Sequence, residues 1–188
     1  MQKIIIGLAG EIACGKDTIA DYMAKKYGSQ KVSFSQPLRD ILDRLFLPQN
    51  RANMAGLGKL LIKQWGDGTL SKVIAEEILN SKKKVFILPN VRRDGDIVHL
   101  KELPGFMLIR VDAEPQTRYE RLIRRGQNTD DASKTREQFE ADSKLWTEVS
   151  IRKIAKKATE KIDNNGDLKD LKLQIDELAK RLKIRKIK

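Results

Sequence analysis

The sequence of 188 residues has too few thiol and imidazole side chains to build several common kinds of site. Cys14 is the only cysteine and His99 the only histidine. An intrachain disulfide is therefore excluded, and zinc sites are disfavoured because they need three or four such ligands. Aromatic residues make up only 5% of the sequence, so few side chains are available to stack on nucleic-acid bases.

Long apolar runs are also missing. No stretch approaches the roughly 18 apolar residues that a membrane-spanning helix needs. The N-terminal run, Ile4–Ala9, has six residues and is shorter than the roughly 7–15 residues of a signal-peptide core. These absences predict a cytoplasmic protein with no membrane partner, and the length suits a single domain over residues 1–188.

Positive charge is what the sequence has in excess. Its 38 Lys and Arg residues against 26 Asp and Glu give a net charge of +12. From Ile151 to the end there are 13 basic and 6 acidic residues. Such a surplus indicates an anionic partner, which composition leaves open between nucleic acid, an acidic membrane and phosphorylated small molecules.

Short apolar runs alternate with segments of helical periodicity. The runs lie at residues 3–8, 31–34, 84–88 and 107–111, with a weaker one at 159–162. Runs that are apolar almost throughout are typical of strands buried on both faces, so the pattern predicts an α/β fold with a five-stranded parallel sheet between helical layers. Trp65 and Trp146 fall in predicted helices and are expected to pack there.

The strongest motif is GEIACGKDT at residues 10–18, which matches the phosphate-binding loop G-x-x-x-x-G-K. Gly10 and Gly15 let the backbone wrap closely around phosphate, and Lys16 would neutralise charge on the β- and γ-phosphates. The motif lies between a predicted buried strand and a predicted helix, as phosphate binding requires. This context favours nucleotide binding over a glycine-rich turn with an accidental lysine.

The motif departs from the common pattern at Asp17, where Ser or Thr usually contacts Mg²⁺. Asp17 is expected either to approach the metal or to stabilise the start of the helix, and both roles stay open. Thr18 would donate to the α-phosphate. Cys14 counts among the loop's nucleotide contacts, and a helix N-terminus would lower the pKa of its thiol.

Three segments of the N-terminal half resemble deoxynucleoside monophosphate kinases of the P-loop superfamily. They are GKDT followed by ADYM at residues 15–23, VSFSQPLR at 32–39 and VFILPNVRRDGD at 85–96. In that family the third segment carries Asp-Val-Arg. Asn90 stands here in place of the Asp, which removes a charge that would help to hold Mg²⁺.

The C-terminal half resembles dephospho-CoA kinases and archaeal nucleotide-kinase-like proteins. RLIRRG at residues 121–126, DD at 130–131 and TREQF at 135–139 resemble their lid, and IDNNGDL at 162–168 resembles their last strand and adenine-side turn. The resemblance implies adenine-side contacts from Asn165 and Gly166. It also implies a P-loop NTPase fold of nucleoside-monophosphate-kinase type, with a helical acceptor region at about 37–82 and a lid at about 125–137.

Arginines are expected to gather the phosphates, because a guanidinium makes paired bonds to phosphate oxygens. Arg92 follows the third strand, and in parallel sheets ligands bind at such carboxyl ends. For each arginine taken singly, the alternative is an ordinary solvated charge. The expected catalytic residues are Lys16, Arg92, Arg121 and Arg125, with Arg124 beside them, and the expected acceptor-binding residues are Arg39, Asp40, Arg92, Arg93 and Arg136.

These features predict an ATP- and Mg²⁺-dependent phosphotransferase with a small phosphorylated acceptor, either a (deoxy)nucleoside monophosphate or dephospho-CoA. A hydroxyl acceptor would need a carboxylate base. No acid follows the second predicted strand until Asp40, which favours a phosphate acceptor. The alternatives are a P-loop ATPase that binds nucleic acid and a nucleotide-binding regulator that has lost catalysis. The identity of the acceptor and the oligomeric state stay open.

Overall fold

Parallel strands and intervening helices form the chain in the computed structural model, which describes residues 2–125 and 131–187. The strands are β1 (Ile4–Ala9), β2 (Gln30–Lys31), β3 (Val85–Leu88), β4 (Phe106–Asp112) and β5 (Glu160–Asp163). The helices are α1 (Lys16–Tyr27), α2 (Gln36–Arg44), α3 (Arg51–Trp65), α4 (Thr69–Asn80), α5 (Pro115–Arg125), α6 (Arg136–Ser143), α7 (Trp146–Ala155) and α8 (Leu168–Arg181), with short 3₁₀ turns η1 (Asp94–Asp96), η2 (Leu100–Glu102) and η3 (Asp131–Ser133).

The five strands form the parallel sheet that the sequence predicts, and the structure shows their order to be β2-β3-β1-β4-β5. β1 is central and is buried from its second residue onward, which explains its unbroken apolar run. β2 is shorter than the predicted strand at 31–34. The Val32 N–H still donates to the Ile87 carbonyl at 2.9 Å, but the chain then turns, and the Ser33 hydroxyl accepts from the Ser35 N–H.

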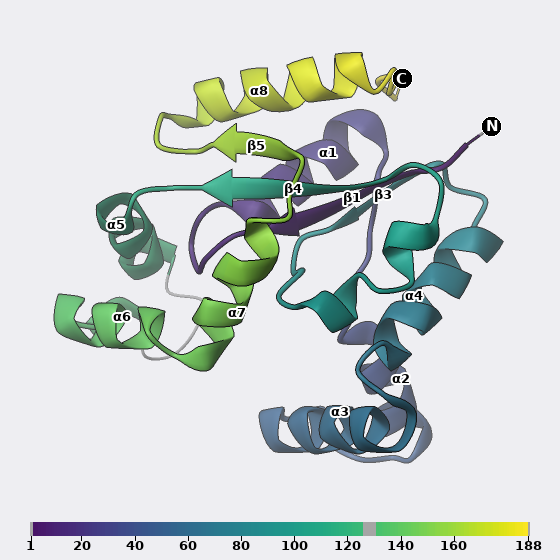
Figure 1. Cartoon of the computed structure of the whole chain (residues 1–188). Helices are drawn as coiled ribbons and strands as arrows, with labels where there is room; N and C mark the ends of the chain where they lie inside the picture. The colour runs from purple at the N-terminus through teal and green to yellow at the C-terminus, as the bar shows by residue number, and fades with distance from the viewer. Residues whose placement is uncertain (1, 126–130, 188) are drawn as a thin grey trace.

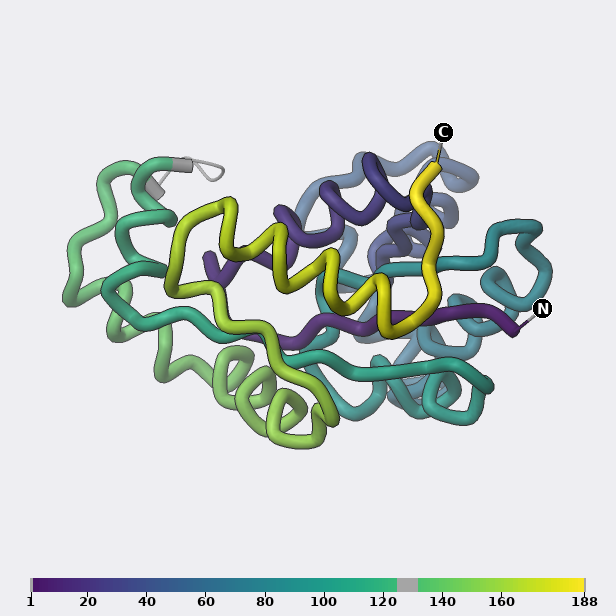
Figure 2. The backbone as a smooth tube through the Cα atoms, turned by 90° about the horizontal axis from the view of Figure 1, so that it is seen from above, coloured from purple at the N-terminus to yellow at the C-terminus, as the bar shows by residue number. Residues whose placement is uncertain are grey.

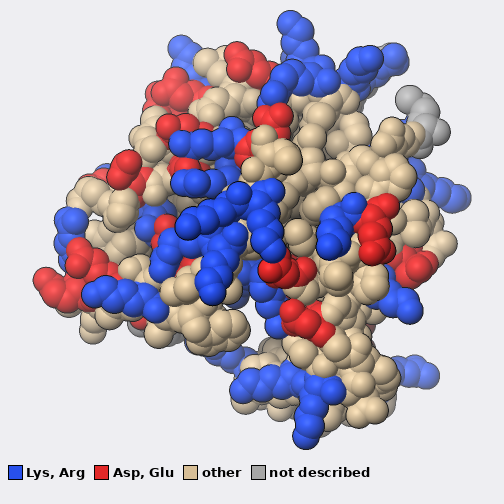
Figure 3. Space-filling model, viewed as in Figure 1, with Lys and Arg blue, Asp and Glu red and all other residues tan. Residues whose placement is uncertain are grey.

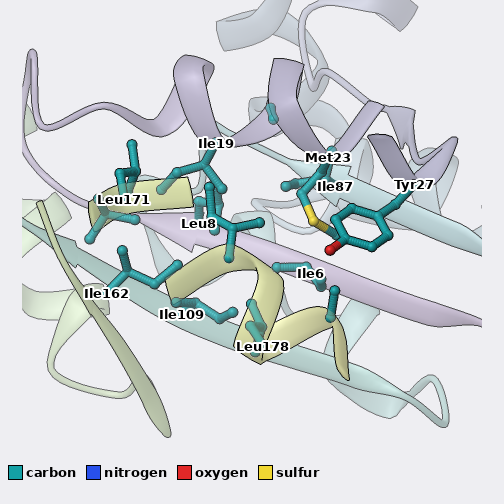
Figure 4. Packing of buried hydrophobic residues seen from close by; sticks show 14 of the residues in the cluster. Ile6, Leu8, Ile19, Met23, Tyr27, Ile87, Ile109, Ile162, Leu171 and Leu178 are labelled. Carbon is teal, nitrogen blue, oxygen red and sulfur yellow. The ribbon is translucent and has the colours of Figure 1, made fainter. Parts of the chain in front are cut away.

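Helices cover both faces of the sheet (Figure 1). α1 and α8 lie together on one face, where Leu8, Ile109 and Ile162 pack against Ile19 and Leu171 (Figures 2 and 4). α4 and α7 cover the other face over a second cluster of buried side chains. Loops at the carboxyl ends of the strands are therefore left free to form a site between these layers.

Two helical regions stand away from this core. α2 and α3 project below the sheet (Figure 1), and Gly58 is the buried residue of α3. Trp65 is 67% exposed at the end of α3 and Trp146 is 71% exposed at the start of α7, so the prediction that they pack is wrong. Both lie where no second layer covers their helix. Within residues 2–125 and 131–187, no helix combines the length and apolar character needed to cross a bilayer.

Candidate nucleotide-binding site

The loop from β1 to α1 has the backbone of a phosphate nest. Ala13 has φ of 60° and Gly15 has φ of 100°, both in the left-handed region, which a non-glycine residue such as Ala13 adopts at an energetic cost. Left-handed residues alternating with right-handed ones turn successive N–H groups toward one point, where an anion can bind. Gly10 lies so close to β4 that a Cβ there would be 2.4 Å from the Val111 carbonyl oxygen.

Lys16 lies across this nest. It is the first residue of α1, and its Nζ donates to the carbonyl oxygens of Gly10 at 2.7 Å and Glu11 at 3.0 Å. The ammonium group and the N-terminus of α1 therefore place positive charge on the same side of the loop. This is the arrangement that the motif predicts for binding phosphate.

Asn164 supports the nest from β5 and is a residue that sequence reasoning missed. Its side chain is 4% exposed, and its Nδ2 donates to the Cys14 carbonyl at 2.8 Å. A Cβ on Gly15 would lie 2.1 Å from that Nδ2, so the amide and the glycine fit against each other. Asn164 directly follows β5, and its place at the carboxyl end of a parallel strand is the signal that could have identified it.

The predicted adenine-side residues lie next in the same turn. The Asn165 Oδ1 accepts from the Glu114 N–H at 2.6 Å, and the Gly166 carbonyl accepts from Arg121 at 3.3 Å. Arg121 also donates to the Asn164 carbonyl at 2.8 Å. Arg121 therefore holds the β5–α8 turn through backbone oxygens.

Glu11 in the loop binds two arginines, which the sequence analysis did not select. Arg118 of α5 lies 3.3 Å from Glu11 Oε2, and Arg152 of α7 donates to Glu11 Oε1 at 2.8 Å. Arg152 also donates to the Ser143 carbonyl at 2.8 Å. The Arg118 side chain is 4% exposed, and a cation so deeply buried needs a nearby carboxylate to offset its loss of hydration.

Apolar and backbone contacts hold the same loop. Ala13 packs with Leu122 and Phe139 in a small buried cluster, and the Arg118 guanidinium lies 5.4 Å from the centre of the Phe139 ring. The Ile12 N–H donates to Glu148 Oε2 at 3.3 Å. Arg118 precedes the buried Leu122 by one helical turn, and this spacing was the available signal that it faces inward. The loop and the segments on either side of the predicted lid are thus one packed unit.

The remaining lid arginines are placed differently. Arg136 starts α6 and binds Glu140 at 3.1 Å and Gln116 of α5, so it joins α6 to α5. Arg124 is exposed on α5. The Arg125 side chain and residues 126–130 of the predicted lid lie outside the described residues.

The predicted acceptor residues fall into two groups. Arg39 donates to Gln49 at 2.8 Å and Asp40 accepts from Gln36 at 2.8 Å, both in the α2–α3 region. Arg92 lies just past β3 with an exposed side chain. These three stay accessible to a ligand.

Arg93, by contrast, is held in ion pairs. It lies 2.7 Å from Asp67 and 3.3 Å from Asp96, and so ties η1 to the α3–α4 turn. Asp96 also accepts from the backbone N–H of Arg92 at 2.8 Å. Burial raises the pKa of Asp96, although these donors oppose the shift. The sequence missed Asp96 as the residue that fixes this turn.

Asp17, Thr18 and Cys14 are the remaining loop residues that the sequence predicts to contact nucleotide or metal. Asp17 lies 3.2 Å from the Lys31 ammonium of β2, and Thr18 is exposed. Cys14 is buried, with its Sγ 3.5 Å from Lys16 Nζ. Burial raises the pKa of the Cys14 thiol even though Lys16 acts to lower it, so the predicted lowering is wrong.

The loop has the backbone and the lysine that suit a nucleoside triphosphate, but few of its side chains could bind a metal. Within the described residues, no three His, Cys, Asp or Glu side chains converge on one point. Mg²⁺ bound with a nucleotide needs only one or two protein ligands besides the phosphates. Asp17 on the loop side and Asn90 after β3 are the side chains that could supply them.

Curated relatives match nearly the whole chain. The UPF0200 protein of Thermococcus sibiricus is 29% identical over 189 residues, covering 97% of each chain. The UPF0200 protein of Sulfurisphaera tokodaii is 26% identical over 180 residues, covering 95% of this chain and 97% of the relative. No protein-family model matches the chain.

Solved structures share the fold at low identity. TT1252 from Thermus thermophilus has a TM-score of 0.61 at 20% identity, covering 97% of this chain and 99% of that one. A shikimate kinase from Bacteroides thetaiotaomicron also scores 0.61, at 14% identity, covering 96% and 98%. A gluconokinase from Sinorhizobium meliloti scores 0.54 at 13% identity, covering 96% and 95%. The predicted α/β fold with a five-stranded parallel sheet is therefore confirmed, and these solved structures share it.

Proposed function

We propose that this chain is an ATP-dependent kinase that transfers the γ-phosphoryl group to a small, nucleotide-like phosphorylated acceptor. The observation that carries the proposal is the loop itself. Ala13 and Gly15 hold a left-handed backbone, and Lys16 lies across the nest that they form. A loop whose backbone can turn N–H groups toward an anion, with an ammonium lying across it, has the chemistry to bind a triphosphate.

The chain's own residues would bind and orient the donor phosphates. Lys16 exchanges its two carbonyl contacts for phosphate oxygens, and the N–H groups of the loop and of the first turn of α1 complete the cradle. Asn164 keeps the Cys14 peptide in place while this happens. Asp17 and Asn90 would hold Mg²⁺ bound with the nucleotide, and the metal would supply positive charge to offset that of the phosphates.

Acceptor binding is assigned to the side of the sheet where α2 and β3 lie. Arg39 donates to Gln49 and Arg92 has an exposed side chain, whereas Arg93 is held by Asp67 and Asp96. An acceptor phosphate is already ionised and needs no base to attack the γ-phosphate. Asp40 is exposed and paired only with Gln36, so it would face a hydroxyl acceptor if one bound. A nucleoside monophosphate would accept at its phosphate and dephospho-CoA at a hydroxyl. Of the two, the phosphate acceptor is favoured.

Shikimate kinase and gluconokinase are named for acceptors that are not nucleotides, so the acceptor panel must be wide. We propose a coupled ADP-release assay with nucleoside monophosphates, deoxynucleoside monophosphates, dephospho-CoA, shikimate and gluconate. Turnover stimulated by one nucleotide-like acceptor is expected. Lys16→Ala should lower it at least about 100-fold, the loss typical of removing a preorganised charge from a transition state. Lys25→Ala, an exposed lysine on the same helix, is the matched control and should retain activity.

Other outcomes of the assay identify the alternatives. Turnover stimulated only by DNA or RNA would indicate a nucleic-acid-dependent ATPase. Binding of ATP with no turnover on any acceptor would indicate a regulator, and either result contradicts the kinase proposal.

A further inference from the structure

A small hollow lies behind the phosphate-binding loop, on the face of the sheet that α7 covers. It has a volume of about 130 Å³ and is bounded by the loop, the end of β4 and α7. A water molecule occupies roughly 30 Å³ of liquid, so the hollow has room for a group of about four or five heavy atoms. Glu11 and Cys14 form the wall toward the loop, and Val111, Ile151 and Ala155 supply apolar surface.

Side-chain direction along β4 explains why this hollow is charged. Leu108 belongs to the core cluster under α4 and α7, and alternate residues of a strand share a face, so Arg110 and Asp112 point to the same side. Lys161 of β5 is the register partner of Arg110 and lies beside it.

Cations outnumber acids in the hollow. Arg110, Arg118, Arg152 and Lys156 line it against Glu11 and Asp112. Each acid is already shared by two cations: Glu11 by Arg118 and Arg152, and Asp112 by Arg110 at 2.6 Å and by Lys161 at 3.2 Å. Lys156 makes no ion pair with any described residue. Figure 3 shows Lys and Arg side chains gathered over α7 on this face.

We propose that this hollow is a second anion site, which binds a phosphate group, either free or carried by a small metabolite. Arginine forks and a lysine ammonium are the groups that bind phosphate oxygens, and the surplus of positive charge over the two shared carboxylates would offset a dianion. The small volume admits one such group. The site adjoins the nest, since Gly10, Glu11 and Cys14 of the loop belong to its lining, but its cations come from β4, α5 and α7 rather than from the start of α1.

A nucleic-acid strand fits these observations less well. Strand binding combines a basic groove with aromatic side chains on which bases stack. The exposed aromatic residue of this region, Trp146, is at the far end of α7, about 15 Å of helix from Lys156. The cations nearest the hollow therefore have no stacking partner beside them.

Titration of inorganic phosphate by calorimetry tests the proposal without any measurement of activity. The titrations use the full chain carrying Lys16→Ala, which weakens the nest, and they are repeated with Lys156→Gln or Arg110→Gln added. One phosphate site is expected in the Lys16→Ala chain, and each added change should weaken it at least tenfold. Lys153→Gln removes the same charge from the same helix outside the lining, so it should leave the affinity within about twofold.

Two further ligands identify the source of the phosphate, and circular dichroism checks that every variant folds. Glycerol 3-phosphate binding more tightly than inorganic phosphate would assign the site to a phosphorylated metabolite, and the reverse order would assign it to the free ion. No phosphate binding by the Lys16→Ala chain would overturn the proposal. Equal losses in Lys153→Gln and Lys156→Gln, or binding of a single-stranded oligonucleotide without phosphate binding, would overturn it too.

Discussion

Asn164 shows how a single buried amide can set the shape of the phosphate-binding loop. Its Nδ2 reaches the Cys14 carbonyl at 2.8 Å across the space that Gly15 leaves open. Asn164→Ala would leave that carbonyl without its donor and is expected to lower the free energy of unfolding by about 1–3 kcal/mol. Affinity for ATP should fall with it, because the Cys14 peptide would no longer be held for binding. Denaturant unfolding and ATP titration measure the two effects.

Asn80→Ala is the matched control for this change. Asn80 is exposed at the end of α4, where its amide donates to the Glu76 carbonyl at 3.0 Å. Its removal should change the unfolding free energy by less than about 0.5 kcal/mol, as at most surface positions. Equal effects of the two substitutions would contradict the role given to Asn164.

Cys14 provides a second prediction for a single residue. Burial raises its thiol pKa, so the folded state keeps the proton at a pH where the unfolded chain, with a pKa of about 8.5, has lost it. The unfolded state then binds fewer protons, and stability should fall as the pH rises above that value. Cys14→Ala should remove this part of the alkaline decline. Labelling by a thiol reagent at neutral pH should need prior unfolding, and rapid labelling of the native protein would contradict the assignment.

Sequence reasoning could find Lys16 but not Arg118 for a physical reason. Lys16 is part of a contiguous motif whose spacing is dictated by one loop. Arg118 acts through Glu11, more than 100 residues away in the chain, and only the packing of α5 against the loop brings them to 3.3 Å. Asn164 reaches the loop in the same way from β5. Local signals for these two residues, a helical turn before Leu122 and a place after a strand, indicate which way each side chain faces but not which loop residue it contacts.

At the scale of elements, α1 and α8 are joined by one carboxylate. Asp176 of α8 accepts from Tyr22 at 2.9 Å and from Tyr27 and Lys26 at 2.7 Å. Burial acts to raise the pKa of Asp176, but the donors outweigh it and the pKa lies below its usual value. Burial and the bond to Asp176 raise the pKa of Tyr27 to about 12. The helix that begins at the loop is thereby fixed to the last helix.

These shifts predict how stability depends on pH. The lowered pKa of Asp176 adds stability that is present above pH about 4 and is lost as the pH falls through the folded-state value. The raised pKa of Tyr27 predicts a second decline between pH about 10, the usual tyrosine pKa, and about 12. Asp176→Asn should lower the urea midpoint at pH 7 and flatten the acid decline. Glu177→Gln, an exposed neighbour on α8, should change neither.

Element boundaries were predictable where the pattern was local. Gly66 and Gly68 lie between α3 and α4, and the Asp167 side chain caps the start of α8, so both boundaries follow from residues close by in the sequence. β2 is shorter than predicted because the Ser33 hydroxyl bonds to both the hydroxyl and the backbone N–H of Ser35, which turns the chain toward α2. Trp65 and Trp146 were expected to pack because they fall in predicted helices. A helical pattern alone cannot show whether other structure covers a given residue, and both are exposed.

At the scale of the whole molecule, the excess of positive charge has several uses. The sequence suggested that arginines crowd one phosphate cleft, yet Arg93, Arg118, Arg136 and Arg152 are held by acids of the chain itself. Arg152 and Lys156 of α7 line the hollow beside the loop, and Lys and Arg side chains gather over α7 in Figure 3. Of the other predicted phosphate ligands, Lys16 and Arg121 bind backbone carbonyls, Arg39 binds Gln49, and Arg92 and Arg124 are exposed.

The central claim is that the loop transfers a phosphoryl group rather than only hydrolysing ATP. The most direct measurement follows the label from [γ-³²P]ATP by chromatography, with and without the acceptor that stimulates ADP release, in the native chain and in Lys16→Ala. If the chain is a kinase, label should appear in the acceptor in a one-to-one ratio with ADP, and the labelled acceptor should disappear in Lys16→Ala. Label recovered only as inorganic phosphate, whichever acceptor is added, would mean hydrolysis without transfer and would contradict the kinase proposal.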